Sequence, residues 1–225
     1  MEKKKYILEF LKDLTQNNNK EWMEANKNRY QTAKRYWLEE VEDILSALSE
    51  HDEHFTMFEP KDTVMRINNN RMFNPNFPIY KDHFAFSPML KTDTYSRIFF
   101  TFSAHESMIG GGLHRPPKEI LEKIRKGIDQ NGSEFEKLIR DEDFVAYYGG
   151  LKRDDQELKS VSRGFDKEHP HRELLRRKNF SYSITPSTEK LLNLDLPDLI
   201  TEAFLKSKKV GEFFQRVTSY KWDVQ

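Results

Sequence analysis

Basic, amide and phenolic side chains are concentrated in one short stretch, residues 66–81, with the sequence RINNNRMFNPNFPIYK. Arg66 and Lys81 could bind an anion by charge-assisted hydrogen bonds, and Tyr80 places a hydroxyl group beside that lysine. His83, two residues further on, could serve as a general acid or base near neutral pH. The stretch has two prolines and no glycine, and loops carry binding groups more often than cores do. We therefore predict a site for a small anionic ligand here.

A triple glycine at 110–112 is the second candidate element. Glycines let backbone N–H groups approach a ligand closely, and a helix is predicted just downstream, where anions are favoured. The spacing matches neither the P-loop nor the dinucleotide pattern, and a triple glycine at a strand end is about as often a bulge or tight bend. Because His114 and Arg115 follow, we predict that Gly111, Gly112 and His114 line the same ligand site.

The elements that would position these residues change character along the chain. Apolar residues recur at helical spacing in residues 7–14 and 37–48, and a second helix is expected from about Asn19. Period-two alternation then predicts half-buried strands at about 64–68, 83–87 and 97–105. These strands follow one another without long helical connectors, which favours antiparallel pairing.

Helices are expected again in the second half. Pro116 and Pro117 suit a first helical turn, a break is expected at Asn131–Gly132, and short helices at about 133–140 and 142–147. Residues 151–169 are predicted to be loop-rich, and Pro170 to open another helix. The tail is expected to form helical patches interrupted at Pro197 and Gly211. We predict a single α+β domain over residues 1–225, with an antiparallel sheet at about 62–114 packed against N- and C-terminal helices.

The alternation also predicts a polar face on the sheet. Its members are Arg66, Asn68, His83, Arg97, Thr101 and His105. A ligand site on this face competes with a simpler interpretation, because antiparallel sheets often leave one polar face to water. Tyr80 and Lys81 also have a simpler interpretation, in which the tyrosine packs in the core and the lysine is exposed to solvent.

Composition excludes several kinds of function. Lys plus Arg and Asp plus Glu both number 37, so there is no overall basic excess of the kind that nucleic-acid binding usually requires. There is no cysteine, which excludes disulfides, thiolate metal sites and a cysteine nucleophile. The N-terminal residues lack the apolar run of a signal peptide, and no stretch approaches the length of a membrane span. We expect a soluble cytoplasmic protein with no membrane contact and no cofactor.

Two further groups of residues could bind a metal ion or a phosphate, but each also has a simpler interpretation. His51 and His54 could share a metal ion, but they end an amphipathic helix where solvated charges are common, and we predict no metal site. A basic cluster could bind a phosphate-rich partner, although acidic residues dilute it and a solvated helix face is the simpler interpretation. This basic cluster comprises Arg163, Lys167, Arg172, Arg176, Arg177 and Lys178.

Taken together, these blocks resemble an uncharacterised bacterial family known as domain of unknown function 2461. The resemblance extends over almost the whole chain. It rests on Phe10-Leu11-x-x-Leu14, the run Asn17 to Trp22, Arg66-Ile67, Phe73, Tyr80-Lys81, Gly110 to Leu113 with the following prolines, Leu151-Lys152, Gly164-Phe165, His169-Pro170, Glu173 to Leu175 and Lys178. The family implies no activity for this chain.

The central block departs from the family pattern, Arg-Ile-x-Arg-Asp-x-Arg-Phe-x-x-Asp-Lys-x-Pro-Tyr-Lys. Asn69 and Asn70 replace the inner Arg-Asp pair, Met72 replaces the next arginine, and Asn76 replaces the second aspartate. Two potential carboxylate bases or metal ligands are thereby lost. This favours binding over acid–base chemistry and leaves open whether the protein is an enzyme.

Three functions follow from these observations. The first is binding of a small anion in a pocket on the sheet, lined by Arg66, Tyr80, Lys81 and His83 with the glycine turn. The second is a non-catalytic protein-interaction module whose partner the sequence does not name. The third and weakest is nucleic-acid binding through the basic cluster.

Overall fold

A computed structural model of the chain describes residues 2–72, 74–89 and 96–219. Its contacts divide the chain into two compact units. The first unit comprises Met1–Pro88, Ile98–Ile109 and Thr185–Glu202, and the second comprises Met89–Arg97, Gly110–Ile184 and Ala203–Gln225. Each is described separately below, and the single domain over residues 1–225 stays a prediction.

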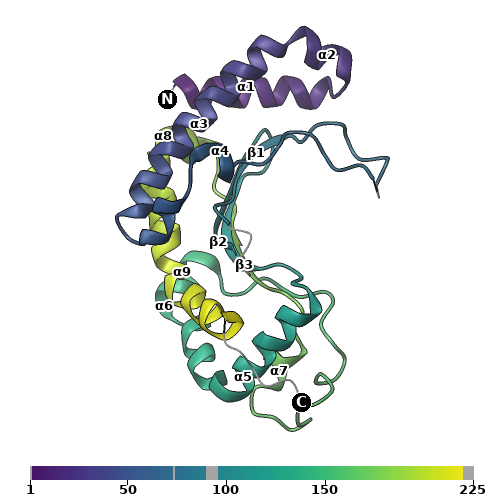
Figure 1. Ribbon diagram of the computed structural model, residues 1–225, viewed down its shortest axis with the longest axis vertical. Helices are drawn as coiled ribbons and strands as arrows, with labels where there is room; N and C mark the ends of the chain where they lie inside the picture. Colours follow the sequence, from purple (N-terminus) through teal and green to yellow (C-terminus); the bar gives the residue numbers. More distant parts are fainter. Residues whose placement is uncertain (1, 73, 90–95, 220–225) are drawn as a thin grey trace. The chain divides into compact units, whose positions relative to one another are not determined.

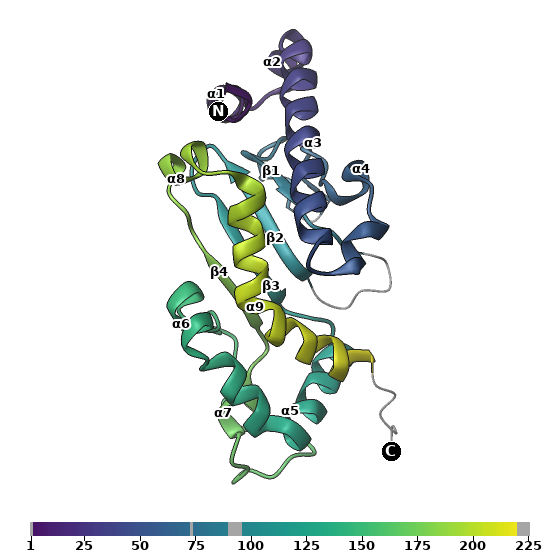
Figure 2. The same ribbon diagram turned by 90° about the vertical axis from the view of Figure 1, so that its left-hand side faces the viewer.

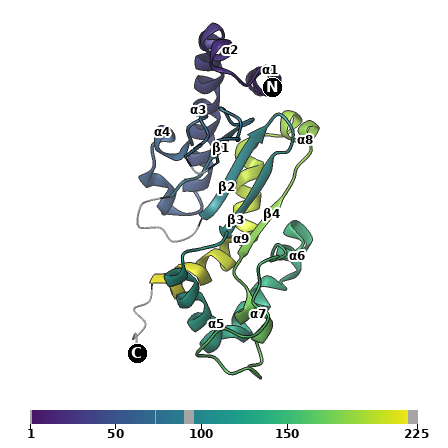
Figure 3. The same cartoon turned by 90° about the vertical axis from the view of Figure 1, so that its right-hand side faces the viewer.

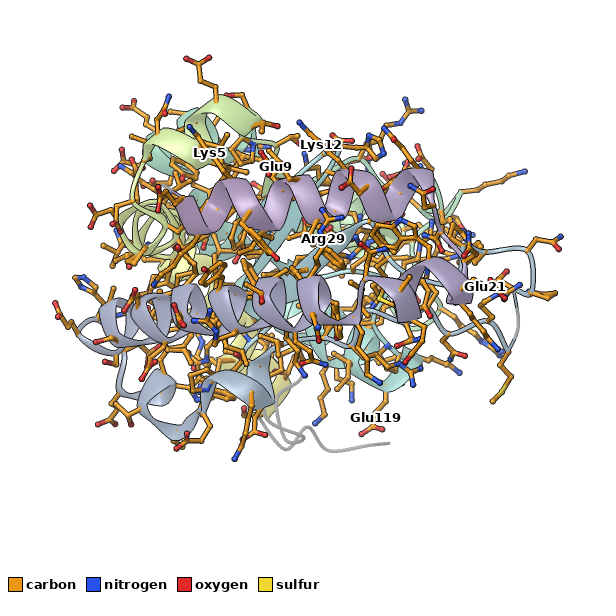
Figure 4. The ribbon with its side chains drawn as sticks, turned by 90° about the horizontal axis from the view of Figure 1, so that it is seen from above. Lys5, Glu9, Lys12, Glu21, Arg29 and Glu119 are labelled. Atoms are coloured by element: carbon orange, nitrogen blue, oxygen red, sulfur yellow. The ribbon has the colours of Figure 1, made fainter. Side chains whose placement is uncertain are left out.

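The first unit begins with three helices, α1 (Glu2–Gln16), α2 (Lys20–Ala25) and α3 (Lys27–Ser49). The apolar stripe of α1 is buried as expected, and α1 lies beside α3 (Figures 1 and 4). The long helix predicted from Asn19 is divided, because Asn26 leaves helical geometry with φ −107° and ψ 18°.

A four-stranded antiparallel sheet follows, with the order β1-β2-β3-β4 (Figure 3). A 3-10 helix, η1 (Glu53–Met57), and α4 (Pro60–Thr63) precede it. The strands are β1 (His83–Phe86), β2 (Ser96–Ser103), β3 (Met108–Leu113) and β4 (Phe180–Ile184). The predicted α+β class and antiparallel sheet are confirmed, but β4 lies far outside the predicted range of 62–114.

An aromatic stack forms the core of the first unit. Helix α3 covers one face of β1 and β2 (Figure 2), and Trp37 projects from it. The Trp37 ring lies 6.0 Å from that of Phe84, 5.6 Å from Phe100 and 6.3 Å from Phe102. All four side chains are buried, so a few large aromatic groups provide the core that a modest apolar fraction requires.

The second unit contains α5 (Lys118–Ile139), α6 (Glu142–Tyr148), α7 (Arg172–Arg176), β4 and the larger part of α9 (Leu196–Ser219). Phe135 of α5 stacks on Phe213 of α9 at 4.6 Å and lies 6.2 Å from Phe180 of β4. The three rings are fully buried. The core of the second unit, like that of the first, is therefore built on aromatic contacts.

The structure confirms one predicted helix break and corrects two. Asn131 leaves helical geometry with φ −129° and ψ 28°, so α5 is kinked at the predicted break and a second helical stretch follows to Ile139. In the tail, α8 (Thr188–Asn193) is followed by α9 (Leu196–Ser219), which continues through Pro197 and Gly211. Proline is tolerated in the first turn of a helix, and buried packing outweighs the propensity cost of one glycine. Among the described helices, none is long and apolar enough to cross a membrane.

Candidate functional site

Residues 66–81 form a hairpin, called the central hairpin below. Asn68 and Tyr80 pair as an antiparallel bridge. The amide of Asn69 donates to the carbonyl of Ile79 at 3.0 Å, and the amide of Lys81 donates to the carbonyl of Ile67 at 2.8 Å. This short ladder brings the two ends of the family's central block, Arg66 and Lys81, side by side.

The middle of the hairpin is closed by its own side chains. Nδ2 of Asn69 donates to the carbonyl of Pro78 at 2.9 Å, and Nε of Arg71 donates to the carbonyl of Pro75 at 3.0 Å. The amide of Met72 donates to Oδ1 of Asn70 at 3.2 Å. Residues that depart from the family pattern therefore stabilise the turn by side-chain to backbone bonds. Phe73 lies outside the described residues.

Asn18 fixes the second arm of the hairpin at Tyr80, a role that the sequence did not reveal. Its Nδ2 donates to the carbonyl of Tyr80, and its Oδ1 accepts from the amide of Tyr80, both at 2.9 Å. The neighbouring asparagines act locally: Asn17 donates to the carbonyl of Asp13 at 2.9 Å, and Asn19 caps α2 by accepting from the amide of Trp22 at 2.8 Å. The Tyr80 side chain is buried.

Arg66 and Lys81 form the cationic part of the site. Nζ of Lys81 donates to the backbone carbonyl of Arg66 at 2.8 Å, and the Arg66 side chain is exposed. Partial burial lowers the pKa of Lys81, and the nearby charge of Arg66 lowers it further. Within the described ranges, neither residue forms an ion pair. Two like charges thus lie close together without a neutralising carboxylate.

His83 lies at the start of β1, paired with Ser103 of β2. Its Nδ1 is 2.8 Å from Oδ1 of Asp82, and the side chain is partly exposed. A carboxylate at Nδ1 fixes the orientation of the ring and leaves Nε2 for other contacts. Asp82 was not singled out from the sequence, although it stands directly before the histidine.

The predicted polar face is only partly open to water. Thr101, opposite Ala85, is buried and its Oγ1 accepts from the amide of Met108 at 2.9 Å. His105 is exposed but follows the end of β2, and Arg97 belongs to the second unit. Thr101 therefore supports the backbone.

The triple glycine lies inside β3 of the second unit rather than in a loop. A Cβ at Gly110 would overlap the carbonyl oxygen of Tyr182, and one at Gly112 would overlap that of Phe180. Gly112 also has φ +84°, which favours glycine. Close approach of β4 thus accounts for two of the three glycines. His114 is exposed after the strand, and a ligand role for Gly111, Gly112 and His114 stays a prediction.

Much of the basic cluster is engaged in local contacts. Arg172 lies 3.6 Å from Glu168, and Arg176 lies 2.9 Å from Glu157. Arg177 donates to the backbone carbonyl of Asn179 at 3.0 Å. Arg163 and Lys167 are exposed members of the cluster and form no ion pair with the described residues.

The histidines near Pro170 each pair with a carboxylate of α5. His169 Nε2 is 3.3 Å from Asp129, and His171 Nδ1 is 3.3 Å from Glu136. The His171 ring packs directly against Gly132, where a Cβ would not fit. Across the described parts of the chain, no group of three His, Asp or Glu side chains is arranged to hold a metal ion.

These features define an α+β protein in which a hairpin carries two neighbouring cations, Arg66 and Lys81, without a carboxylate partner among the described residues. The chain belongs to the family described as conserved hypothetical protein (DUF2461), whose family model matches residues 6–213. This confirms the resemblance seen in the sequence. No curated protein and no solved structure matches the chain.

Proposed function

We propose that the protein binds a small anion through Arg66 and Lys81. The observation that supports this is the pair of neighbouring cations, which form no ion pair with a described residue. Partial burial, and then the charge of Arg66, lower the pKa of Lys81. An anion between two such cations would relieve their repulsion and accept charge-assisted hydrogen bonds. Binding rather than acid–base chemistry agrees with the asparagines at the two aspartate positions of the family pattern.

The hairpin is suited to this role because it is fixed before the ligand arrives. Asn18 holds both backbone polar groups of Tyr80, and the ladder holds Lys81. Preorganisation of this kind reduces the entropy cost of binding. His83 would add a donor through Nε2.

Thermal unfolding in inorganic phosphate, at ionic strength held constant with chloride, tests this function. Phosphate should raise the unfolding midpoint by mass action. Arg66→Gln or Lys81→Gln should weaken the apparent affinity by about tenfold, the low end of the effect of one charge-assisted contact. Lys5→Gln is the control, because Lys5 projects from the exposed face of α1 near Glu9 (Figure 4). An equal phosphate response in all four proteins would contradict the proposal.

A second candidate, a protein-interaction module, is supported by exposed apolar side chains on the same hairpin. Met72 is 78% exposed and Phe77 is 52% exposed. Met, Phe and Arg are enriched in protein interfaces, whereas acidic residues are depleted, and residues 64–81 contain none. The double variant Met72→Ser/Phe77→Ser should then lose binding to a purified partner and keep its phosphate response. Retained partner binding would show that Met72 and Phe77 are not part of the interface.

A further inference from the structure

The amine of Lys81 is placed differently from the other lysines of the first unit that have described contacts. Lys4 is buried and its Nζ donates to the carbonyl of Leu191 at 2.9 Å. Lys3 lies 2.7 Å from Glu39, and that hydrogen bond raises the pKa of Lys3. Lys81 instead is partly exposed, contacts a neutral carbonyl and lies beside a cation.

We propose that Lys81 forms a Schiff base with a 2-oxo acid whose carboxylate is bound by Arg66. This rests on the proposed function, since the carboxylate would be the anion that the cationic pair binds. The carbonyl of Arg66 holds Nζ through one N–H bond, at 2.8 Å. A neutral amine can keep that bond and direct its lone pair elsewhere, toward an electrophilic carbon.

Burial first, and then the charge of the neighbouring Arg66, lower the pKa of Lys81, which is the direction that a nucleophilic amine requires. Desolvation and a neighbouring cation are the two means by which proteins activate a nucleophilic lysine. The exposed guanidinium of Arg66 is free of described ion pairs and can hold a carboxylate by two parallel hydrogen bonds.

The step balances without any further reactant. The lone pair of the neutral Nζ attacks the carbonyl carbon, and one proton passes from the nitrogen to the carbonyl oxygen. The resulting carbinolamine loses this oxygen as water together with the second proton of the nitrogen, and a carbon–nitrogen double bond forms in place of the carbon–oxygen double bond. No atom is oxidised or reduced, so the only other product is water.

Reductive trapping with pyruvate and cyanoborohydride tests the proposal on the full chain. Peptide mass spectrometry should find the carboxyethyl adduct on Lys81 about tenfold above that on Lys3, since a bound carboxylate concentrates the reacting carbonyl. In Arg66→Gln, labelling of Lys81 by pyruvate should fall by about tenfold, the effect of one lost charge-assisted contact. Labelling by acetone, which has no carboxylate, should fall less.

Labelling of Lys81 no greater than that of Lys3 would overturn the Schiff base, as would pyruvate labelling that Arg66→Gln leaves unchanged. The phosphate assay separates this failure from failure of the proposed function. In Lys81→Arg, which has no primary amine at this position, the adduct on the peptide containing position 81 should disappear. A phosphate response without trapping in the wild-type protein would refute the Schiff base alone, and the absence of both would refute both.

Discussion

The central hairpin and the connecting segment, residues 151–179, are both irregular and polar, but they use their side chains in opposite ways. In the connecting segment, charged groups hold the backbone. Arg125 of α5 is buried and donates to the carbonyls of Leu175 and Arg177 at 2.9 and 3.0 Å. Asp154 accepts from the amide of Asn179 at 2.9 Å.

In the central hairpin, neutral amides make most of the side-chain bonds to the backbone. Asn18 and Asn69 fix its arms and its turn, whereas the cations Arg71 and Lys81 each donate to a backbone carbonyl and stay at least partly exposed. A charge that is buried in backbone contacts stabilises the fold and is unavailable to a ligand. Counting basic residues therefore points to the connecting segment, whereas two neighbouring cations without a carboxylate partner among the described residues are found in the hairpin.

The largest effect should come from Arg125→Met. Loss of the guanidinium leaves buried carbonyls without a donor, at about 1–3 kcal/mol each, so the free energy of unfolding should fall by roughly 3 kcal/mol. Urea unfolding measures this. Arg163 is an exposed arginine of the connecting segment, and Arg163→Met should change the free energy of unfolding by less than about 0.5 kcal/mol. Equal effects of the two variants would show that the connecting segment does not depend on its buried charges.

Asn18→Ala should follow, with a loss of about 2 kcal/mol for its two hydrogen bonds to Tyr80. Amide hydrogen exchange at Tyr80 should also accelerate, because the variant removes the acceptor of that N–H group. Asn28→Ala, at an exposed position of α3, is the matched control and should leave this exchange rate unchanged. Slow exchange at Tyr80 in Asn18→Ala would mean that the ladder alone fixes the hairpin.

Asp154→Asn should have a smaller, pH-dependent effect. Desolvation acts to raise the pKa of Asp154, but hydrogen bonds from the amides of Lys178, Gln156 and Asn179 outweigh it, and the pKa is lowered from 3.8. The ionised group therefore stabilises the fold above its ordinary pKa, and this contribution is lost as the pH falls through the lowered value. Near neutral pH, the free energy of unfolding of the wild-type protein should exceed that of the variant by about 1–2 kcal/mol.

The same urea measurement, repeated in acid, checks the sign of that prediction. The difference between wild type and Asp154→Asn should shrink as the carboxylate becomes protonated. A constant difference at all pH values would assign the effect to shape rather than to charge.

The smallest effect on stability is expected in the hairpin. Arg66→Gln and Lys81→Gln should each change the free energy of unfolding by less than about 0.5 kcal/mol, because exposed charges without ion pairs contribute little to folding. A loss near that of Arg125→Met would break the comparison, since the hairpin cations would then also hold the fold.

Local patterns made part of the fold predictable. Alternation in residues 97–105 located β2, and the apolar spacing of residues 7–14 located the buried face of α1. The strand β4 was missed because its residues, 180–184, lie close to helical signals and pair only with distant β3. The helix continued through Gly211 because tertiary packing, which the sequence does not display, outweighs local propensity.

The candidate site was likewise predictable from the sequence only in part. Residue type alone indicated Arg66 and Lys81, and the ladder that brings them together depends on a pairing within the same short stretch. Asn18 could not be found, because its partner Tyr80 is 62 residues away. The close contacts of Gly110 and Gly112 likewise required knowledge of β4.

The bond between Asn18 and Tyr80 also bears on the order of folding. Contacts between distant residues form late, because the intervening chain must first be closed into a loop. During synthesis the amide of Asn18 has no partner until Tyr80 has emerged, whereas Asn19 can cap α2 at once. The helices at the N-terminus therefore form first and provide the contact that the central hairpin reaches once Tyr80 has emerged.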